Sequence, residues 1–178
     1  MSLVISGYGG QGILFLGTII AKCAMLAKKN VTWLPSYGAE MRGGTANCTI
    51  VVSDNEISSP YQQNPNYVIA LNAQSVEKFE SKIKPGGAII VNSSLYKGQE
   101  KRTDISYTHI PANEIAQKIG EIKCANVVML SAFIQKTKLV NLQGLKNILS
   151  SIISSSKEKF LKLNEKAATA GAEYTTLL

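Results

Sequence analysis

Two glycine-rich segments near the N-terminus hold the residues whose types and spacing could do chemistry. The first is Gly7-Tyr-Gly-Gly-Gln-Gly12, and the second is Ser36-Tyr-Gly-Ala-Glu-Met-Arg-Gly-Gly-Thr45. Within the second, Glu40 and Arg42 lie two positions apart, so in an extended segment both side chains point to the same side. A carboxylate and a guanidinium placed in this way can form a salt bridge that holds a turn, which is an unusual pair to find in a glycine-rich loop.

The first loop fits the G-x-G-x-x-G spacing through Gly7, Gly9 and Gly12, between a predicted strand and a predicted helix. Backbone N–H groups at such a turn and at the helix N-terminus favour an anion. A dinucleotide site also needs an acidic residue about 20 residues further on. The segment 32–36 has neither a carboxylate nor an arginine for a 2′-phosphate, which argues against NAD(P). Two roles stay open: binding the phosphate of another ligand, and tight packing of the strand on the helix.

No complete catalytic apparatus is predicted in this chain. His109 is the only histidine, and a structural role is favoured for it over that of a base. The chain lacks a G-x-S-x-G elbow, a Ser/His/Asp set and an H-E-x-x-H motif, and it lacks the Gly-Asp-Gly segment typical of thiamine diphosphate enzymes. Cys23, Cys48 and Cys124 have no C-x-x-C spacing, which excludes a local iron–sulfur or zinc motif. We expect three buried thiols and no metal site.

The charge of the chain does not predict nucleic-acid binding, although the formal net charge is +7. The lysines of the C-terminal half are spread among glutamates, as on solvated helix faces. There is no arginine-rich run and no interleaving of basic and aromatic residues. No apolar run reaches the ~18 residues that a membrane span requires, and the N-terminus does not resemble a signal peptide. We therefore expect a cytoplasmic protein with no membrane span.

Strand-like and helix-like segments alternate along the chain. Periodicity and turn residues predict strands at 3–7, 30–34, 46–53, 66–71, 88–92 and 105–110, and helices at 11–29, 75–84, 111–119, 126–137, 142–153 and 157–170. The helix at 11–29 is apolar almost all round and is expected to be buried. This order predicts a three-layer α/β fold with a Rossmann-like start and an open, mostly parallel or mixed sheet, with helices on both faces. We expect one domain over 1–170 and a C-terminal tail over 171–178.

Taken together, the motifs resemble those of the gamma subunit of 2-oxoacid:ferredoxin (acceptor) oxidoreductases. The same module occurs as an internal domain of single-chain pyruvate:ferredoxin oxidoreductase. The resemblance rests on the segment 7–12 and on the specific block Tyr-Gly-x-Glu-x-Arg-Gly-Gly within 35–48. It extends over nearly the whole chain through shorter matches at 53–54, 57–60, 66–72, 126–130 and 166–173.

The resemblance implies a division of labour between subunits. The family oxidatively decarboxylates a 2-oxoacid with thiamine diphosphate and Mg²⁺, passes electrons through 4Fe-4S clusters to ferredoxin or another acceptor, and releases acyl-CoA and CO₂. These cofactors would belong to alpha, beta and ferredoxin-like delta subunits, with none tightly bound in this chain. The isolated chain is expected to be inactive. Pyruvate, 2-oxoglutarate and branched 2-oxoacids stay open as substrates, with a lean to 2-oxoglutarate. The alternative is a stand-alone nucleotide-binding Rossmann-like enzyme.

The resemblance also suggests which residues meet coenzyme A (CoA), a phosphate or the active-site face of a partner. Glu40 and Arg42 would form a buried or interfacial ion pair, contact a partner, or simply hold their own loop. Tyr37 is a ligand contact or a packing residue. Val127, Met129, Phe133 and Ile134 are expected to belong to the core, and a subunit interface stays open as the other use of these residues. The full candidate set is Gly7, Gly9, Gly10, Gln11, Gly12, Ser36, Tyr37, Gly38, Glu40, Arg42, Gly43 and Gly44.

Overall fold

The computed structural model describes residues 1–36 and 45–177. Within these residues the chain forms a mixed six-stranded sheet with the strand order β2-β3-β1-β4-β5-β6. Its strands are β1 (Ser2–Tyr8), β2 (Asn30–Ser36), β3 (Thr45–Ser53), β4 (Tyr67–Ala70), β5 (Ala88–Asn92) and β6 (Ser106–Ile110). The strands β1, β4, β5 and β6 are parallel, whereas β3 runs antiparallel to both β1 and β2. The predicted mixed sheet is therefore confirmed.

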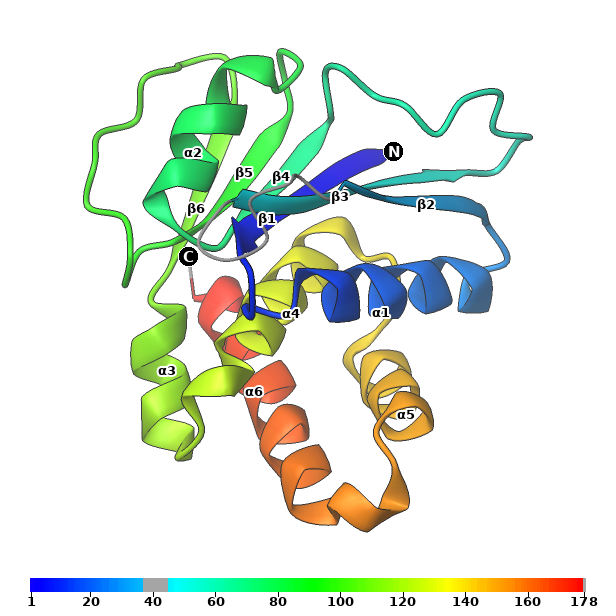
Figure 1. The fold of residues 1–178 in the computed structure, drawn as a ribbon, viewed down its shortest axis with the longest axis vertical. Helices are drawn as coiled ribbons and strands as arrows, with labels where there is room; N and C mark the ends of the chain where they lie inside the picture. The colour runs from blue at the N-terminus through cyan, green and yellow to red at the C-terminus, as the bar shows by residue number, and fades with distance from the viewer. Residues whose placement is uncertain (37–44, 178) are drawn as a thin grey trace.

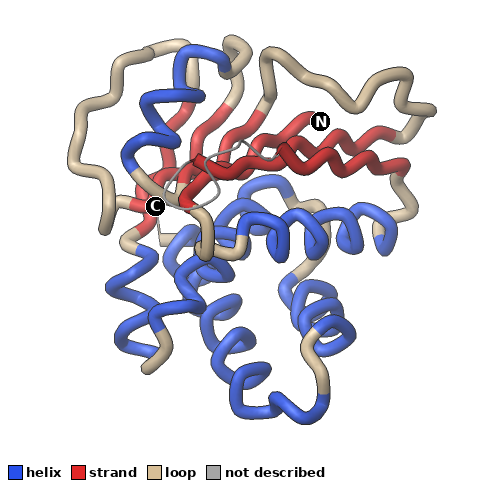
Figure 2. The backbone as a smooth tube through the Cα atoms, viewed as in Figure 1, coloured by secondary structure: helices blue, strands red, loops and turns tan. Residues whose placement is uncertain are grey.

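Helices cover both faces of this sheet, as predicted. The helix α2 lies on one face and the other α-helices lie on the opposite face (Figures 1 and 2). The α-helices are α1 (Ile13–Leu26), α2 (Ala73–Phe79), α3 (Ala112–Ile119), α4 (Ala125–Thr137), α5 (Leu142–Ile152) and α6 (Glu158–Thr176). Short 3₁₀ helices, η1 (Glu80–Lys82), η2 (Ile122–Cys124) and η3 (Ser155–Lys157), precede or follow three of them.

The central strands are apolar because both of their faces are covered. In β1, Leu3 and Ile5 belong to the larger core on the side of α1 and α4, whereas Val4 belongs to the smaller core under α2. The four apolar residues of α4 that the sequence assigned to the core are all buried. This prediction is therefore confirmed for Val127, Met129, Phe133 and Ile134.

Gly17 explains how closely α1 approaches the sheet. A Cβ at Gly17 would overlap with Nε1 of Trp33 on β2 and would lie 3.0 Å from Sγ of Cys48 on β3. The glycine gives up helix propensity worth roughly 1 kcal/mol relative to alanine. In return, the helix backbone lies directly against the edge of the sheet.

The expectation that α1 is buried all round is wrong for one side of the helix. Leu14 and Phe15 are half-buried, and Met25 and Leu26 are 66% and 57% exposed. The opposite side packs on the sheet and against α4 and α5. The apolar sequence of α1 therefore overestimates how much of this helix the described residues bury.

The C-terminal residues also differ from the prediction. The segment 171–176, expected as a tail, continues α6 to Thr176. Gly171 and Ala172 are buried, and a Cβ at Gly171 would overlap with the backbone oxygen of Val128 on α4. The contact between α4 and α6 therefore fixes these residues, because small side chains let the two helices approach closely.

Candidate functional site

The candidate site lies at the edge of the sheet where β1, β4 and β5 end. From β1 the chain passes through α1 towards β2 and β3, and from β4 it passes through α2 on the opposite face towards β5 (Figure 1). The strand order thus reverses between β1 and β4. Ligands of open α/β sheets bind outside the carboxyl ends of the strands at such a switch point.

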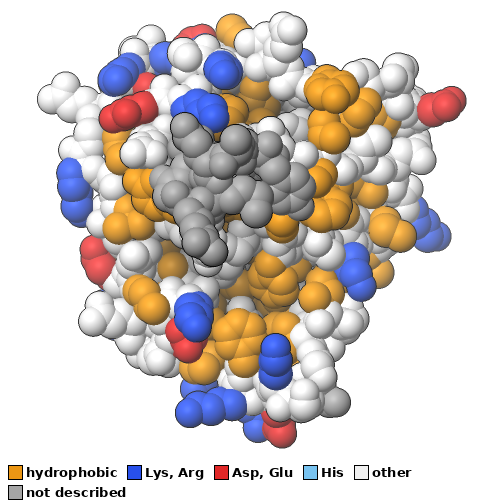
Figure 3. All heavy atoms as spheres, in the orientation of Figure 1, with side chains coloured by type: hydrophobic (Ala, Val, Ile, Leu, Met, Phe, Trp, Pro, Cys, Tyr) orange, Lys and Arg blue, Asp and Glu red, His pale blue; other side chains and the backbone are white. Residues whose placement is uncertain are grey.

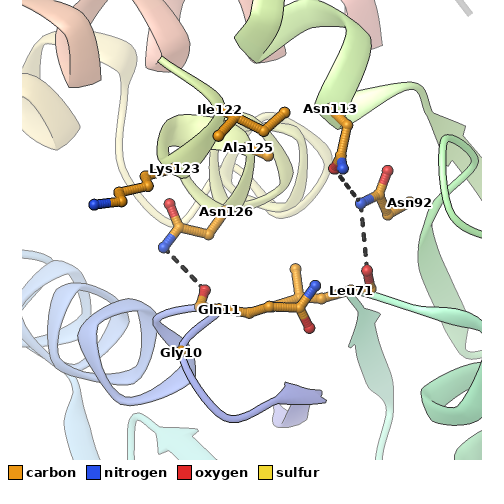
Figure 4. A pocket seen from close by; sticks show the side chains of 9 residues that line it. All are labelled: Gly10, Gln11, Leu71, Asn92, Asn113, Ile122, Lys123, Ala125 and Asn126. Atoms are coloured by element: carbon orange, nitrogen blue, oxygen red, sulfur yellow. Dashed lines mark hydrogen bonds between the residues drawn. The ribbon is translucent and has the colours of Figure 1, made fainter.

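A pocket of about 180 Å³ opens at this edge (Figure 4). Residues at or just after the ends of β1, β4 and β5 form one part of its lining, and residues of η2 and of the starts of α3 and α4 form the rest. Nearly all of its polar groups are amides, with one ammonium group at Lys123 and no carboxylate among the described lining residues. The lining residues are Gly10, Gln11, Leu71, Asn92, Asn113, Ile122, Lys123, Ala125 and Asn126.

Gln11 shapes the glycine loop from within. Its side-chain Oε1 accepts hydrogen bonds from the backbone N–H of Tyr8 at 2.6 Å and from Nδ2 of Asn72 at 3.2 Å. A Cβ at Gly7 would lie only 2.5 Å from that same Oε1, so Gly7 leaves room for the glutamine. The Tyr8 N–H is therefore already paired with the chain's own amide.

Asn126 holds the loop from α4. Its Nδ2 donates to the backbone oxygen of Gln11 at 3.1 Å (Figure 4), and a Cβ at Gly12 would overlap with this amide. Gly12 has φ 76°, a left-handed conformation that L side chains rarely adopt. Glycine is thus required here both by the backbone conformation and by the close approach of α4. Tight packing, one of the two roles left open for the glycines, is what this geometry supports directly.

A second amide pair closes the other end of the pocket. Nδ2 of Asn92, at the end of β5, donates to Oδ1 of Asn113 at 2.9 Å and to the backbone oxygen of Leu71 at 3.3 Å (Figure 4). Ser94 Oγ accepts from the N–H of Asn113 at 3.2 Å. These contacts fix the start of α3 beside the ends of β4 and β5.

The electrostatics of the pocket favour an anion. No side chain caps α1, and its first turn has no acidic residue. The helix α4 follows directly on η2, whose start is capped by Glu121 through the N–H of Lys123 at 3.0 Å. Helix N-termini carry partial positive charge and unpaired N–H groups. Lys123 lies at one end of the pocket, with its ammonium group pointing away from Asn92 and Asn113 (Figure 4). The arrangement offers donors and positive charge but no base.

The second glycine-rich segment begins and ends beside the same edge. Ser36 pairs with Asn47 at the end of β2, and Thr45 pairs with Tyr8 at the end of β1. The structure therefore brings Gly7, Gly9, Gly10, Gln11 and Gly12 to the edge where Ser36 and Thr45 lie. The other candidates, Tyr37, Gly38, Glu40, Arg42, Gly43 and Gly44, lie outside the described residues.

Sequence reasoning missed the asparagines of this edge as site residues. Asn72 and Asn92 each follow a run of buried apolar residues, at 68–71 and 88–91. A polar amide placed directly after a fully apolar strand is a signal for the carboxyl edge of a parallel sheet. No comparable sequence signal marks Lys123 and Asn113, because their position beside the pocket depends on how α3 and α4 pack.

His109 and the cysteines lie apart from the pocket lining. Nε2 of His109 is 2.9 Å from Oε1 of Glu100, and its ring stacks on Tyr107, which supports the structural role. Burial raises the pKa of Cys23 to about 12 and the pKa of Cys48 and Cys124 to about 11. These thiols are therefore protonated and unreactive at neutral pH. Within residues 1–36 and 45–177, no group of three His, Cys, Asp or Glu residues is placed to hold a metal ion.

Comparison with known proteins shows the family to which the chain belongs. The model of the pyruvate ferredoxin/flavodoxin oxidoreductase family matches residues 2–174, so the chain belongs to this family. The resemblance expected from the motifs is thereby confirmed. None of the described helices combines the length and the apolar character needed to cross a membrane.

Named relatives are subunits of 2-oxoacid oxidoreductases. The 2-oxoglutarate synthase subunit KorC of Methanocaldococcus jannaschii is 35% identical over 88% of this chain and 86% of its own length. The ketoisovalerate oxidoreductase subunit VorA of Methanothermobacter thermautotrophicus is 34% identical over 96% of this chain, which spans only 35% of VorA. The solved gamma subunit of a keto/oxoacid ferredoxin oxidoreductase from Geobacter sulfurreducens has a TM-score of 0.82 at 27% identity, with 99% of both chains covered.

Proposed function

We propose that this chain is the gamma subunit of a multi-subunit 2-oxoacid:ferredoxin (acceptor) oxidoreductase. The complex would convert a 2-oxoacid and CoA to acyl-CoA and CO₂ in the cytoplasm. The observation that carries the proposal is the family match over residues 2–174, together with a KorC relative that it matches over most of both chains. Thiamine diphosphate, Mg²⁺ and 4Fe-4S clusters would be held by alpha, beta and delta subunits.

The proposed task of this chain is to help form the route by which CoA reaches the acyl intermediate. The edge pocket supports this task because it combines the uncapped N-terminus of α1 with Lys123 and has no carboxylate among its described lining residues. CoA carries phosphates, which such donors bind well. Gln11 and Asn126 would act as positioning residues that hold the glycine loop in place.

The 2-oxoacid itself is proposed only as a class, with the lean to 2-oxoglutarate kept as a prediction. Relatives named for ketoisovalerate and for 2-oxoglutarate are 34% and 35% identical to this chain. A relative named as a pyruvate synthase subunit is 32% identical over 92% of the chain. Similarity of this subunit therefore does not separate the three acids.

The test is an assay of the native complex purified through this chain. Reduction of ferredoxin or of a viologen dye would be followed with 2-oxoglutarate, pyruvate or 3-methyl-2-oxobutanoate, each with and without CoA. The proposal expects CoA-dependent reduction with at least one of the three acids, and the lean expects 2-oxoglutarate to give the highest kcat/KM. A lone chain that binds NAD(P) and supports no such reaction would favour the stand-alone alternative.

A further inference from the structure

The side-chain amide of Gln11 has a fixed orientation at the edge pocket. Its Oε1 accepts hydrogen bonds from the backbone N–H of Tyr8 at 2.6 Å and from Nδ2 of Asn72 at 3.2 Å. Turning the amide over would place its NH₂ group against these two donors. The side chain lines the pocket and extends from the glycine loop towards Leu71 (Figure 4). Nε2 of Gln11 has no hydrogen-bond partner among the described residues, so it remains available as a donor at the pocket.

Asn72 holds the amide of Gln11 in this orientation from the start of α2. Asn72 is 2% exposed and caps the helix. Its Oδ1 accepts from the N–H and from the hydroxyl of Ser75, both at 2.9 Å. Because Oδ1 is engaged in the helix cap, Nδ2 is the group that faces Gln11. The cap of α2 therefore also sets which end of the Gln11 amide is free.

A second pair of amides is oriented in the same way on the other side of the pocket. Oδ1 of Asn92 accepts from the backbone N–H of Ser94 at 3.2 Å. Its Nδ2 donates to the backbone oxygen of Leu71 at 3.3 Å and to Oδ1 of Asn113 at 2.9 Å. The NH₂ group of Asn113, which also lines the pocket, is thereby left without a partner among the described residues.

Two unpaired NH₂ groups at one small pocket favour a ligand that accepts hydrogen bonds. On the face drawn in Figure 3, the charged side chains of the described residues lie scattered, mostly towards its outline. The pocket is marked instead by neutral amides, with the single ammonium group of Lys123. Phosphate and carboxylate oxygens accept strongly from such donors, because the bonds are charge-assisted. A ligand group that is itself a donor would face the two NH₂ groups without an acceptor.

We propose that Asn72 and Asn92 are positioning residues that turn the amides of Gln11 and Asn113 so that both NH₂ groups bind an oxygen acceptor of a substrate. The inference rests on the proposed function, which supplies two substrates with this chemistry. These are CoA, through its phosphates, and the 2-oxoacid, through its carboxylate. Asn72 acts only through Gln11, because Asn72 itself does not line the pocket.

Asn72→Asp in the assembled complex tests this role, because it replaces only the NH₂ group of the side chain. Aspartate caps a helix as well as asparagine does, so the contacts with Ser75 are retained. The second carboxylate oxygen then faces Oε1 of Gln11 and turns the Gln11 amide over, which leaves an acceptor at the pocket. We expect the KM for CoA or for the 2-oxoacid to rise about five- to fiftyfold. The kcat should stay within about twofold of the wild type.

Gln74→Glu is the matched control. Gln74 is exposed in the first turn of α2, two residues from Asn72, and it does not line the pocket. The control adds the same negative charge to the same helix end, and both KM values should stay unchanged. Calorimetric titration of each complex with CoA and with the 2-oxoacid gives the Kd values without turnover. The substrate whose KM and Kd rise in Asn72→Asp is the one that the amides bind.

Gln11→Glu gives a second readout that does not depend on Asn72. One carboxylate oxygen still accepts from Tyr8 and Asn72, and the other replaces the NH₂ group at the pocket. The KM for the same substrate should rise by a similar factor. In a Gln11→Ala background, Asn72→Asp should change this KM by less than about twofold, because no amide is left to turn. A purely structural role of Asn72 would give the same factor in both backgrounds.

The inference is overturned if Asn72→Asp and Gln11→Glu leave the KM and Kd values of both substrates equal to those of Gln74→Glu. An equal effect of Asn72→Asp with and without Gln11 would also overturn it. Its failure is distinguishable from failure of the proposed function. A wild-type complex that forms acyl-CoA, with variants that behave like the control, refutes only the role of the amides. A wild-type complex that oxidises none of the three 2-oxoacids refutes the function, and the Kd values for CoA still decide the role of the amides.

Discussion

At the scale of single residues, Gly17 provides a sharp test of the fold. Replacing Gly17 with alanine should lower the free energy of unfolding by about 1–3 kcal/mol, because the new Cβ would overlap with the Trp33 indole. The effect runs against helix propensity, which favours alanine by roughly 1 kcal/mol. Urea denaturation followed by circular dichroism measures the change.

A double-mutant cycle separates the overlap from other effects of the substitution. Trp33→Leu removes the indole, so Gly17→Ala should cost about 1 kcal/mol less in that background than in the wild type. Equal costs in both backgrounds would show that Trp33 does not limit the space at position 17.

The buried thiols predict a loss of stability at alkaline pH. Burial raises the pKa of Cys23 from 9.0 to about 12, so between these values the unfolded chain releases a proton that the folded chain keeps. Stability is therefore full below about pH 8 and falls as pH rises towards 12. At about pH 10, this thiol alone should account for a loss of about 1 kcal/mol.

The measurement compares the wild type with Cys23→Ala at about pH 8 and about pH 10. Lysines and tyrosines titrate in both proteins, so only the difference between the two slopes reports on Cys23. The wild type should lose about 1 kcal/mol more than the variant over this range. Parallel losses would contradict a buried, protonated thiol.

At the scale of elements, α6 shows where sequence patterns stop being informative. Gly171 has a low helix propensity, and the sequence predicts a tail over 171–178. The structure places Gly171 against the backbone of α4, a long-range contact that periodicity cannot reveal. For α1 the sequence predicts too much burial instead of too little. A run of apolar residues does not show which side of a helix packs against the rest of the described chain.

Gly171→Ala tests the corrected end of α6. The added Cβ would overlap with the Val128 backbone oxygen, and backbone cannot move aside as a flexible side chain can. We expect a loss of about 1–3 kcal/mol in the free energy of unfolding. Glu173→Ala, on the exposed side of the same turn, should change it by less than about 0.5 kcal/mol. If Gly171→Ala leaves the free energy of unfolding unchanged or raises it, the close packing of Gly171 against α4 is contradicted.

The strand–loop–helix start and the alternation of strands and helices could be predicted, because buried parallel strands are short apolar runs between turn residues. The edge pocket could be predicted only in part. The G-x-G-x-x-G spacing predicts the glycine loop. By contrast, Lys123 and Asn113 lie at the pocket only because of how α3 and α4 pack. Their contribution depends on tertiary structure, which no local motif encodes.

Lys123 tests the role of the edge pocket in the assembled enzyme. Lys123→Ala should raise the KM for CoA about two- to fivefold, as expected for the loss of one partly exposed charge contact, and should leave kcat unchanged. Lys118→Ala removes an exposed lysine from α3 and serves as the control. Steady-state kinetics with CoA varied at saturating 2-oxoacid measure both. Identical values for the two variants would place CoA away from this pocket.

At the scale of the whole molecule, the described residues form a pocket suited to an anion, unreactive thiols and a partly exposed apolar side of α1. No catalytic apparatus is present among these described residues. These features fit a subunit whose chemistry is completed by its neighbours.

Reconstitution of the complex with and without this chain tests that central claim most directly. The measured quantity is acyl-CoA formed from a 2-oxoacid, CoA and an electron acceptor by the remaining subunits. We predict that omission abolishes acyl-CoA formation and that adding the purified chain back restores it. Full CoA-dependent activity in the absence of this chain would contradict the account.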